Sequence, residues 1–160
     1  MNTALIVLLA LGASDTLGEA SVGAMKFKAP TSWRFEQTDA ETKSWTSSDE
    51  KGAVSFYSGQ LEKVRPAKAC VDAMVAAVGV DGFEFAPIGA QPAAKKITQD
   101  FIGDKEEDKT EANRVVTTTW VGCDGKTKWL LTFSARKSEG ARFGAILRRM
   151  LDSIAYGKAP

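Results

Sequence analysis

The densest group of chemically active side chains is a run of carboxylates between Asp104 and Glu111. Calcium takes several oxygen ligands, so a weak calcium site is one interpretation of such a run. The spacing is not that of an EF-hand loop, however, and Lys105 and Lys109 are interleaved. We therefore expect a solvated loop with no metal ligands. The carboxylates are Asp104, Glu106, Glu107, Asp108 and Glu111.

The chain has no histidine, which removes the commonest general base and the commonest metal ligand together. Ser-His-Asp and Cys-His sites cannot be built without it. Neither a GxGxxG nor a GxxxxGK[ST] phosphate loop occurs. A two-carboxylate hydrolase using Asp39 or Asp100 is conceivable, but nothing in their spacing supports it. We expect a protein that is not an enzyme, that binds no cofactor, and for which no small-molecule ligand is indicated.

Cys70 and Cys123 are the only cysteines. Two cysteines this far apart do not form a zinc or redox motif, but in an oxidising compartment they can pair. The bond would close a loop worth on the order of 4 kcal/mol in the chain-entropy model. The alternative is two unrelated thiols, as residence in the cytosol would give.

Charge and exposed aromatic residues bear on partners. Lys and Arg number 21 and Asp and Glu 20, so a net charge of +1 gives no reason to expect nucleic acid or an anionic membrane. Three arginines lie off the apolar stripe of the last predicted helix, and several aromatic residues lie in the first half of the chain. They are a possible surface for a protein partner, although a solvated helix face and sheet packing also explain them. The residues are Trp33, Arg34, Trp45, Tyr57, Arg142, Arg148 and Arg149.

The N-terminus contains an apolar run, Ala4–Ala13, of the length of a secretory h-region and short for a membrane span. We assign residues 1–24 to a signal peptide and a flexible lead-in, with cleavage after Ala13 or after Ala20, and residues 25–160 to one domain. No Lys or Arg precedes the run. A buried first helix or an uncleaved anchor are the alternatives. Export predicts a periplasmic or secreted protein with no membrane span after cleavage.

Residues 114–136 form the strongest local signal, a β-hairpin. Two strand-like runs flank Asp124-Gly125, a pair typical of a two-residue turn. That turn places Trp120 opposite Trp129 and Thr118 opposite Leu131, with Val116 opposite Phe133, on one strongly apolar face. The other face, which holds Val115 and Val121 among threonines, is mixed. We expect the tryptophans to be core residues.

The remaining elements follow from periodicity and turn residues. Two amphipathic helices are expected at Ala67–Val78 and Ser138–Tyr156, the second with Ser138 as N-cap and Gly157 as its end. Residues 14–24 are small and polar, and residues 103–112 are a charged loop. Strands are expected at Met25–Pro30, Trp33–Gln37, Lys43–Ser48, Ala53–Gly59, Phe83–Ile88 and Lys95–Ile102.

These elements predict an α+β fold with a single antiparallel sheet covered by helices on both faces. The C-terminal helix has the apolar stripe to cover the tryptophan face. The helix at Ala67–Val78 would cover the mixed face, which places Cys70 near Cys123 at the hairpin tip.

The order of these elements resembles the PsbP-like fold. Pro30-Thr31-Ser32-Trp33 within FKAPTSWRF, and the ending FGAILRRMLDSI, carry the resemblance, which spans residues 25–156. The fold is shared by photosystem II PsbP, Ran-binding Mog factors and bacterial DcrB-like proteins. It implies an α/β/α sandwich acting as a binding or assembly module, and no active-site residue is carried over.

The function expected is that of an exported, non-enzymatic bacterial protein that binds or assembles an unknown protein partner. The partner would contact the sheet edge or the exposed surface of the first strands. The alternative is a cytosolic chaperone or adaptor of the DcrB-like type, which would shield apolar helices of a secreted client. This alternative requires free thiols and an attached N-terminal run.

Overall fold

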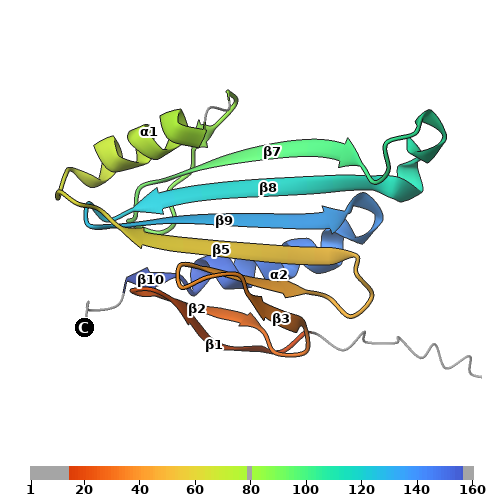
Figure 1. The fold of residues 1–160 in the computed structure, drawn as a ribbon, viewed down its shortest axis with the longest axis horizontal. Helices are drawn as coiled ribbons and strands as arrows, with labels where there is room; N and C mark the ends of the chain where they lie inside the picture. Colours follow the sequence, from red (N-terminus) through yellow and green to blue (C-terminus); the bar gives the residue numbers. More distant parts are fainter. Residues whose placement is uncertain (1–14, 79–80, 157–160) are drawn as a thin grey trace, which may run out of the picture.

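The computed structural model describes residues 15–78 and 81–156, and Figure 1 shows how their elements are arranged. Most strands belong to one seven-stranded antiparallel sheet with the order β3-β4-β5-β9-β8-β7-β6. A second, three-stranded sheet has the order β1-β2-β10. The strands of the large sheet are β3 (Arg34–Gln37), β4 (Thr42–Thr46), β5 (Gly52–Gln60), β6 (Glu84–Phe85), β7 (Ala93–Phe101), β8 (Arg114–Cys123) and β9 (Thr127–Arg136).

The small sheet corrects the expectation of a flexible lead-in. β1 (Leu17–Val22) pairs along its whole length with β2 (Met25–Pro30), and β10 (Ala155–Tyr156) joins β2 on the other side. The two strands are joined by a tight turn in which Gly23 has a φ of 54°. The part of the proposed leader before Asp15 lies outside the described residues.

The hairpin of β8 and β9 has the predicted faces but a register shifted by two residues. Trp120 lies opposite Leu131, and Trp129 lies opposite Gly122. The turn is centred on Gly125 and Lys126 because the Asp124 carboxylate accepts hydrogen bonds from the N–H groups of Lys126 and Thr127 at 2.8 and 2.7 Å. A shift by two keeps every side chain on its face, so the predicted faces are right and the predicted pairs are wrong. Trp129 is buried in the core as predicted, whereas Trp120 is only partly buried against it.

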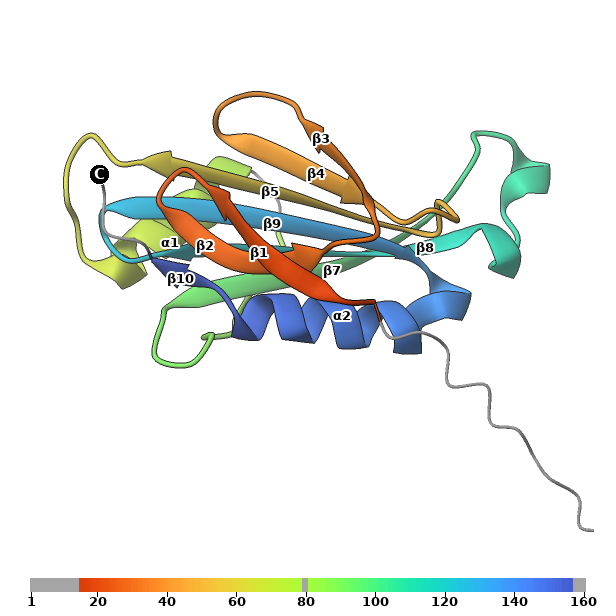
Figure 2. The ribbon, with the colours of Figure 1, turned by 90° about the horizontal axis from the view of Figure 1, so that it is seen from below.

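The main core lies between the two sheets. Phe27 of β2 stacks on Phe56 of β5 with ring centroids 4.3 Å apart, and Phe56 lies 5.8 Å from Trp129 of β9. α2 (Gly140–Asp152) lies beside the small sheet and buries Phe143 and Met150 in the same core. Figure 2 shows the small sheet and α2 together over one face of the large sheet.

α2 is shorter than the helix expected at Ser138–Tyr156. Residues 137–139 form a 3₁₀ turn, so Ser138 is not the N-cap. The helix ends at Asp152, with Ser153 as its C-cap, before the chain enters β10. The other helix, α1 (Ala67–Val78), has the predicted bounds. Its Cys70 and Val71 pack on Val121 and Cys123, on the opposite face of the large sheet from α2.

The α+β class with antiparallel strands is therefore confirmed, whereas the cover on the two faces differs from the expectation. One face carries α2 and the small sheet, and α1 packs only at the hairpin-tip end of the other. The strand expected at Phe83–Ile88 is reduced to β6, while the other expected strands are present within a few residues. Short 3₁₀ turns at Glu106–Asp108 and Glu111–Asn113 join β7 to β8.

Candidate functional site

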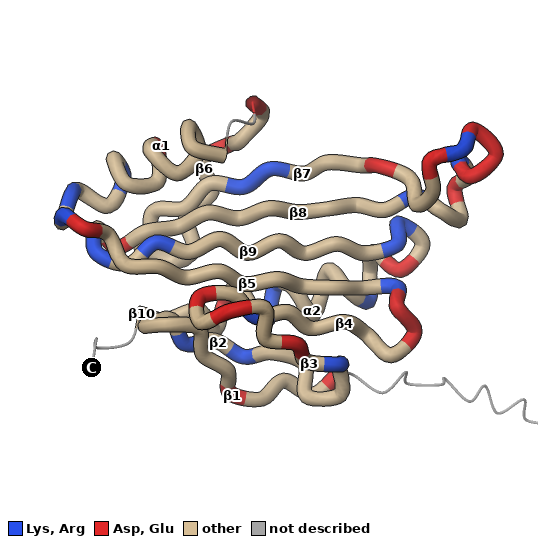
Figure 3. The backbone as a smooth tube through the Cα atoms, in the orientation of Figure 1, with Lys and Arg blue, Asp and Glu red and all other residues tan. Residues whose placement is uncertain are grey.

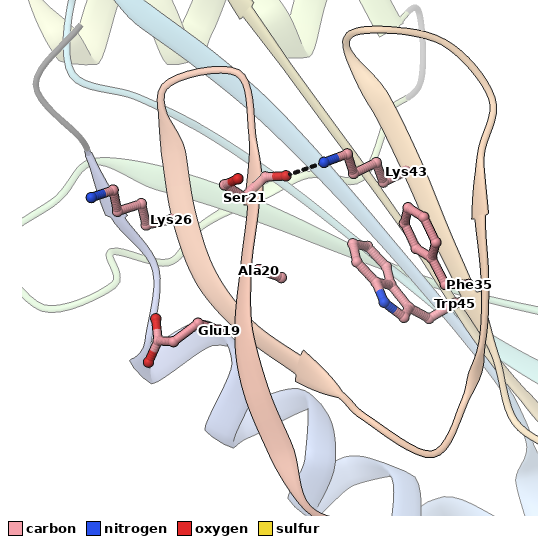
Figure 4. A pocket seen from close by; sticks show the side chains of 7 residues that line it. All are labelled: Glu19, Ala20, Ser21, Lys26, Phe35, Lys43 and Trp45. Atoms are coloured by element: carbon pink, nitrogen blue, oxygen red, sulfur yellow. Dashed lines mark hydrogen bonds between the residues drawn. The ribbon is translucent and has the colours of Figure 1, made fainter. Parts of the chain in front are cut away.

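A cleft of about 620 Å³ lies at the seam between the two sheets. One wall is the outer edge of β1, and the other is the hairpin of β3 and β4, as Figure 4 shows. The cleft is lined by Glu19, Ala20, Ser21, Lys26, Phe35, Lys43 and Trp45.

The β1 wall presents backbone groups to the cleft. Thr31 N–H donates to Thr16 C=O at 2.9 Å, which sets the alternation of the β1–β2 ladder. Because hydrogen-bonding direction alternates along an antiparallel pair, even-numbered residues of β1 bond to β2. The odd-numbered residues Glu19 and Ser21 therefore direct their N–H and C=O groups outward. The Ser21 C=O accepts a hydrogen bond from Lys43 Nζ across the cleft at 2.8 Å.

The opposite wall is aromatic. Phe35 and Trp45 lie opposite each other on β3 and β4, with ring centroids 5.5 Å apart. Trp45 is 6% exposed because Phe27 packs against it edge-on, whereas Phe35 is 52% exposed. A large apolar side chain this exposed beside a cleft is a candidate anchor point for a partner.

The charges around the cleft are mostly positive. Lys43 bridges the two walls, and Lys26 lies on the exposed side of β2. The one acidic lining residue, Glu19, lies 3.9 Å from Lys28, a loose and exposed pair that stabilises little. The lining thus suits an extended segment that offers an apolar side chain to Phe35 and a negative charge to the lysines.

The aromatic and Arg34 positions predicted as a partner surface do not form one patch. Trp33 is buried in the core, where it packs edge-on to Phe143 at 5.6 Å. Trp45 is also buried but lines the cleft. Tyr57 lies on the opposite face of the sheet with Lys128 Nζ over its ring, and Arg34 is exposed near Glu50 at 3.7 Å.

Two of the three predicted arginines hold the N-terminal segment in place. Arg142 pairs with Asp49 at 2.9 Å and with Asp15 at 3.5 Å. Arg149 donates to the Asp15 C=O at 3.0 Å. The hydrogen bond with Asp49 raises the pKa of Arg142 above its usual value. Arg148 is exposed on α2.

The carboxylate run folds as the two 3₁₀ turns and faces neighbouring cations. Glu106 pairs with Lys109 at 2.7 Å, and Glu111 pairs with Arg114 and Lys137. The Arg114 and Lys137 hydrogen bonds lower the pKa of Glu111. Asp39 and Asp100, each considered as one carboxylate of a hydrolase site, lie near opposite edges of the large sheet, so the structure does not bring these two carboxylates together.

The predicted disulfide is confirmed. Cys70 and Cys123 are bonded with an S–S distance of 2.06 Å, and both are buried. The bond ties α1 to the tip of the β8–β9 hairpin, as the faces of the hairpin indicated. Within residues 15–78 and 81–156, no helix is long and apolar enough to cross a membrane, and no cluster of three metal-ligating side chains occurs.

Sequence reasoning missed most of the cleft. The sequence carries no signal that brings Phe35, Lys43 and Lys26 together, because their proximity depends on β1, in a segment whose small and polar residues predict a flexible lead-in. The available signal was Val22-Gly23-Ala24-Met25, in which a glycine separates two apolar residues, as in a turn that joins two strands.

No model of a known protein family matches the chain, and neither does any curated protein sequence. Solved structures do match. A crystallised protein from Bacteroides thetaiotaomicron superposes with a TM-score of 0.63 at 12% identity over 84% of this chain, and this chain spans 46% of that protein.

Cyanobacterial PsbP (CyanoP) from Synechocystis sp. PCC 6803 superposes with a TM-score of 0.57 at 11% identity, over 92% of this chain and 95% of the cyanobacterial one. The resemblance to the PsbP-like fold is thereby confirmed. At this identity the likeness concerns the fold alone.

Proposed function

We propose that the protein is a non-enzymatic binding module that captures an extended segment of a protein partner in the cleft between β1 and the β3–β4 hairpin. The observation that carries the proposal is the outer edge of β1, which no other described strand pairs with, facing the exposed Phe35 across that cleft. An added strand would hydrogen-bond to the outward groups of Glu19 and Ser21, as in other cases of strand addition. Its side chains would meet the aromatic wall and Lys43, which projects from the same face of β4 as Trp45.

Peptide-library selection against the folded chain tests this proposal. Selected peptides are expected to be extended, with an apolar residue and an acidic residue close together. Phe35→Ser should weaken binding by about tenfold or more, whereas Phe85→Ser, which removes an exposed phenylalanine from β6, should leave binding unchanged. Equal binding by both variants would contradict the proposal that the peptide binds in the cleft.

A backbone variant separates strand addition from simple side-chain contact. Ser21→Pro removes an N–H that points into the cleft and not toward β2, and proline is tolerated at a strand edge. It should abolish peptide binding, while Ser21→Ala retains both the N–H and the affinity. Far-UV circular dichroism of each variant checks that the sheets are intact.

We also propose that the protein is exported to the periplasm or secreted. The buried Cys70–Cys123 bond supports this, because such bonds persist in oxidising compartments. The alternative of a cytosolic adaptor requires free thiols. Mass spectrometry of the protein from its native source distinguishes the two: loss of the apolar run together with an intact disulfide supports export, and an intact Met1 with free thiols contradicts it.

A further inference from the structure

The far edge of the large sheet is open along most of β7. β6 pairs only with Ala94 and Lys95, and within the described residues no strand pairs with the outer side of β7 from Lys96 to Phe101. Figure 1 shows β7 as the outermost long strand, with α1 near one end of it. An unpaired edge of this length is a template for another strand.

The alternation of the ladder identifies which groups are free. Ile102 N–H donates to Asn113 C=O at 2.9 Å, and Ala86 N–H donates to Ala93 C=O at 2.9 Å. Even-numbered residues of β7 therefore bond to β8, and odd-numbered residues point outward. Ile97 and Gln99 consequently direct N–H and C=O groups outward that have no strand partner among the described residues, and the Ile97 side chain is 55% exposed.

The charges along this edge are placed symmetrically. Lys96 and Asp100 lie on one face of the strand, each two residues from Thr98. Figure 3 shows β7 basic toward one end and acidic toward the other. Lys96 Nζ donates to the Asp81 C=O, and the Asp100 carboxylate accepts from the Phe101 N–H at 2.8 Å. Among the described residues, neither charge has an opposite charge beside it.

We infer that β7 pairs antiparallel with β7 of a second copy of this chain, about a two-fold axis through Thr98. In that register Lys96 of each copy lies opposite Asp100 of the other, on the same face. Ile97 of each copy lies opposite Gln99 of the other, so the outward N–H and C=O groups are exchanged. A two-fold interface must be self-complementary, and this segment meets that requirement.

The apolar side chains also favour this register. The two Ile97 side chains become diagonal neighbours on one face, a position in which cross-strand side chains still touch. Because β6 occupies the edge beside Lys95, pairing is confined to residues 96–100. An interface of this size is small, and the dimer is expected to be weak and concentration-dependent.

This dimer does not depend on the proposed cleft. β7 and β3 lie near opposite edges of the seven-stranded sheet, so each surface stays accessible when the other is occupied. Substitutions that affect one surface should leave the other unchanged.

Sedimentation equilibrium of the whole protein over a concentration series tests the inference by measuring the dissociation constant of the dimer. Asp100→Lys places two like-charged pairs in the interface and should raise the dissociation constant by about tenfold or more. Lys96→Asp combined with Asp100→Lys restores opposite charges in reversed order and should recover dimerisation. A folding defect could not produce this recovery, so the pair of variants isolates the register.

Gln99→Pro provides a separate test of the backbone contacts. It removes an outward N–H without disturbing the ladder to β8, and it should leave the protein monomeric with an unchanged circular dichroism spectrum. A wild-type chain that stays monomeric at about 0.5 mM would overturn the inference, because the dissociation constant would then exceed about 1 mM, too weak for a specific interface. Dimerisation that is equally strong in Gln99→Pro would also overturn it.

Discussion

At the scale of single residues, Asp49 joins the turn between β4 and β5 to α2. Its carboxylate accepts from the Ser47 hydroxyl at 2.6 Å and from Arg142 at 2.9 Å. The Ser47 hydrogen bond, followed by that of Arg142, lowers the pKa of Asp49 from 3.8 to about 2. Because the folded-state pKa lies below the unfolded value, the carboxylate stabilises the fold above that value. The contribution is lost as the pH falls toward 2.

Asp49→Asn should therefore reduce the free energy of unfolding at neutral pH and flatten its acid dependence. The loss should be no more than about 1 kcal/mol, since the carboxylate is partly exposed and solvent screens its ion pair. Urea unfolding, followed by tryptophan fluorescence between about pH 2 and 7, measures both effects. Asp152→Asn, on an exposed part of α2, is the control, and the idea fails if the two variants keep the same acid slope.

Tyr156 provides the hydrogen-bond acceptor for the indole N–H of Trp129, the most deeply buried tryptophan. Trp129 is fully buried, and its Nε1–H donates to the Tyr156 hydroxyl at 3.0 Å. Burial raises the pKa of Tyr156 from 10.0 to about 12. The unfolded chain thus loses its phenolic proton at lower pH than the folded one, so stability is retained below about pH 10 and falls as the pH rises toward 12.

Tyr156→Phe should cost about 1–2 kcal/mol, because it leaves the buried indole N–H without an acceptor. It should also remove the part of the alkaline loss of stability that arises from this phenol. Thermal unfolding at neutral and alkaline pH provides the measurement. Tyr57→Phe removes a hydroxyl from the opposite sheet face and should change neither quantity. A neutral-pH loss as small as that of Tyr57→Phe would argue against the hydrogen bond.

At the scale of elements, hydrophobic periodicity predicts which face of a strand or helix is buried, but it does not predict where the element begins and ends. The alternation from Val115 to Cys123 identified the buried side of the hairpin because side-chain parity survives a shift by two residues. The shift itself arises from the Asp124 side chain, which caps the turn and moves its centre to Gly125-Lys126. The 3₁₀ turn before α2 likewise depends on local geometry that an apolar stripe does not encode.

The disulfide is expected to be the main tie between α1 and the sheet. α1 covers a small cluster of apolar residues, and the bond closes a separation of 53 residues. Replacing Cys70 and Cys123 together with alanine should lower the free energy of unfolding by up to about 4 kcal/mol. Hydrogen exchange should show the amides of α1 losing more protection than those of β5 and β9.

Reductant gives the matching control for this prediction. When reductant is present during unfolding, the wild-type disulfide is reduced, and the wild-type chain should have the same free energy of unfolding as the double variant. The free energy of unfolding of the double variant should not change with reductant. Unchanged protection of α1 in the double variant would mean that Val71 and its neighbours hold the helix without the bond.

At the scale of the whole molecule, the two sheets share one core and the candidate site lies where they meet. The sequence indicated the PsbP-like order of elements and one lining residue, Trp45. It did not indicate Phe35, Lys43 or the edge of β1 as a site, because β1 and the β3–β4 hairpin form a cleft only once the small sheet has docked on the large one. The stacking of Phe27 on Phe56, which joins the two sheets, also depends on this docking and was not predictable from the sequence.

The same arrangement distinguishes between the two predicted cleavage points. Cleavage after Ala20 would divide β1 and remove Asp15, which accepts from Trp33 Nε1 at 3.3 Å and pairs with Arg142. It would also remove Leu17, which packs against the core. Cleavage after Ala13 would leave every described residue in place. If the proposed leader is removed, we therefore expect the mature chain to begin at Ser14.

Two shortened chains test this expectation. A chain that begins at Ser21 should lose about 2–4 kcal/mol of unfolding free energy relative to one that begins at Ser14, since it gives up buried apolar surface and the Asp15 contacts. It should also lose peptide binding at the cleft, because one wall is missing. Urea unfolding and peptide titration measure the two effects together. Equal stability of the two chains would show that β1 adds little to the core, and the wall it forms would then be too loosely held to template a partner strand.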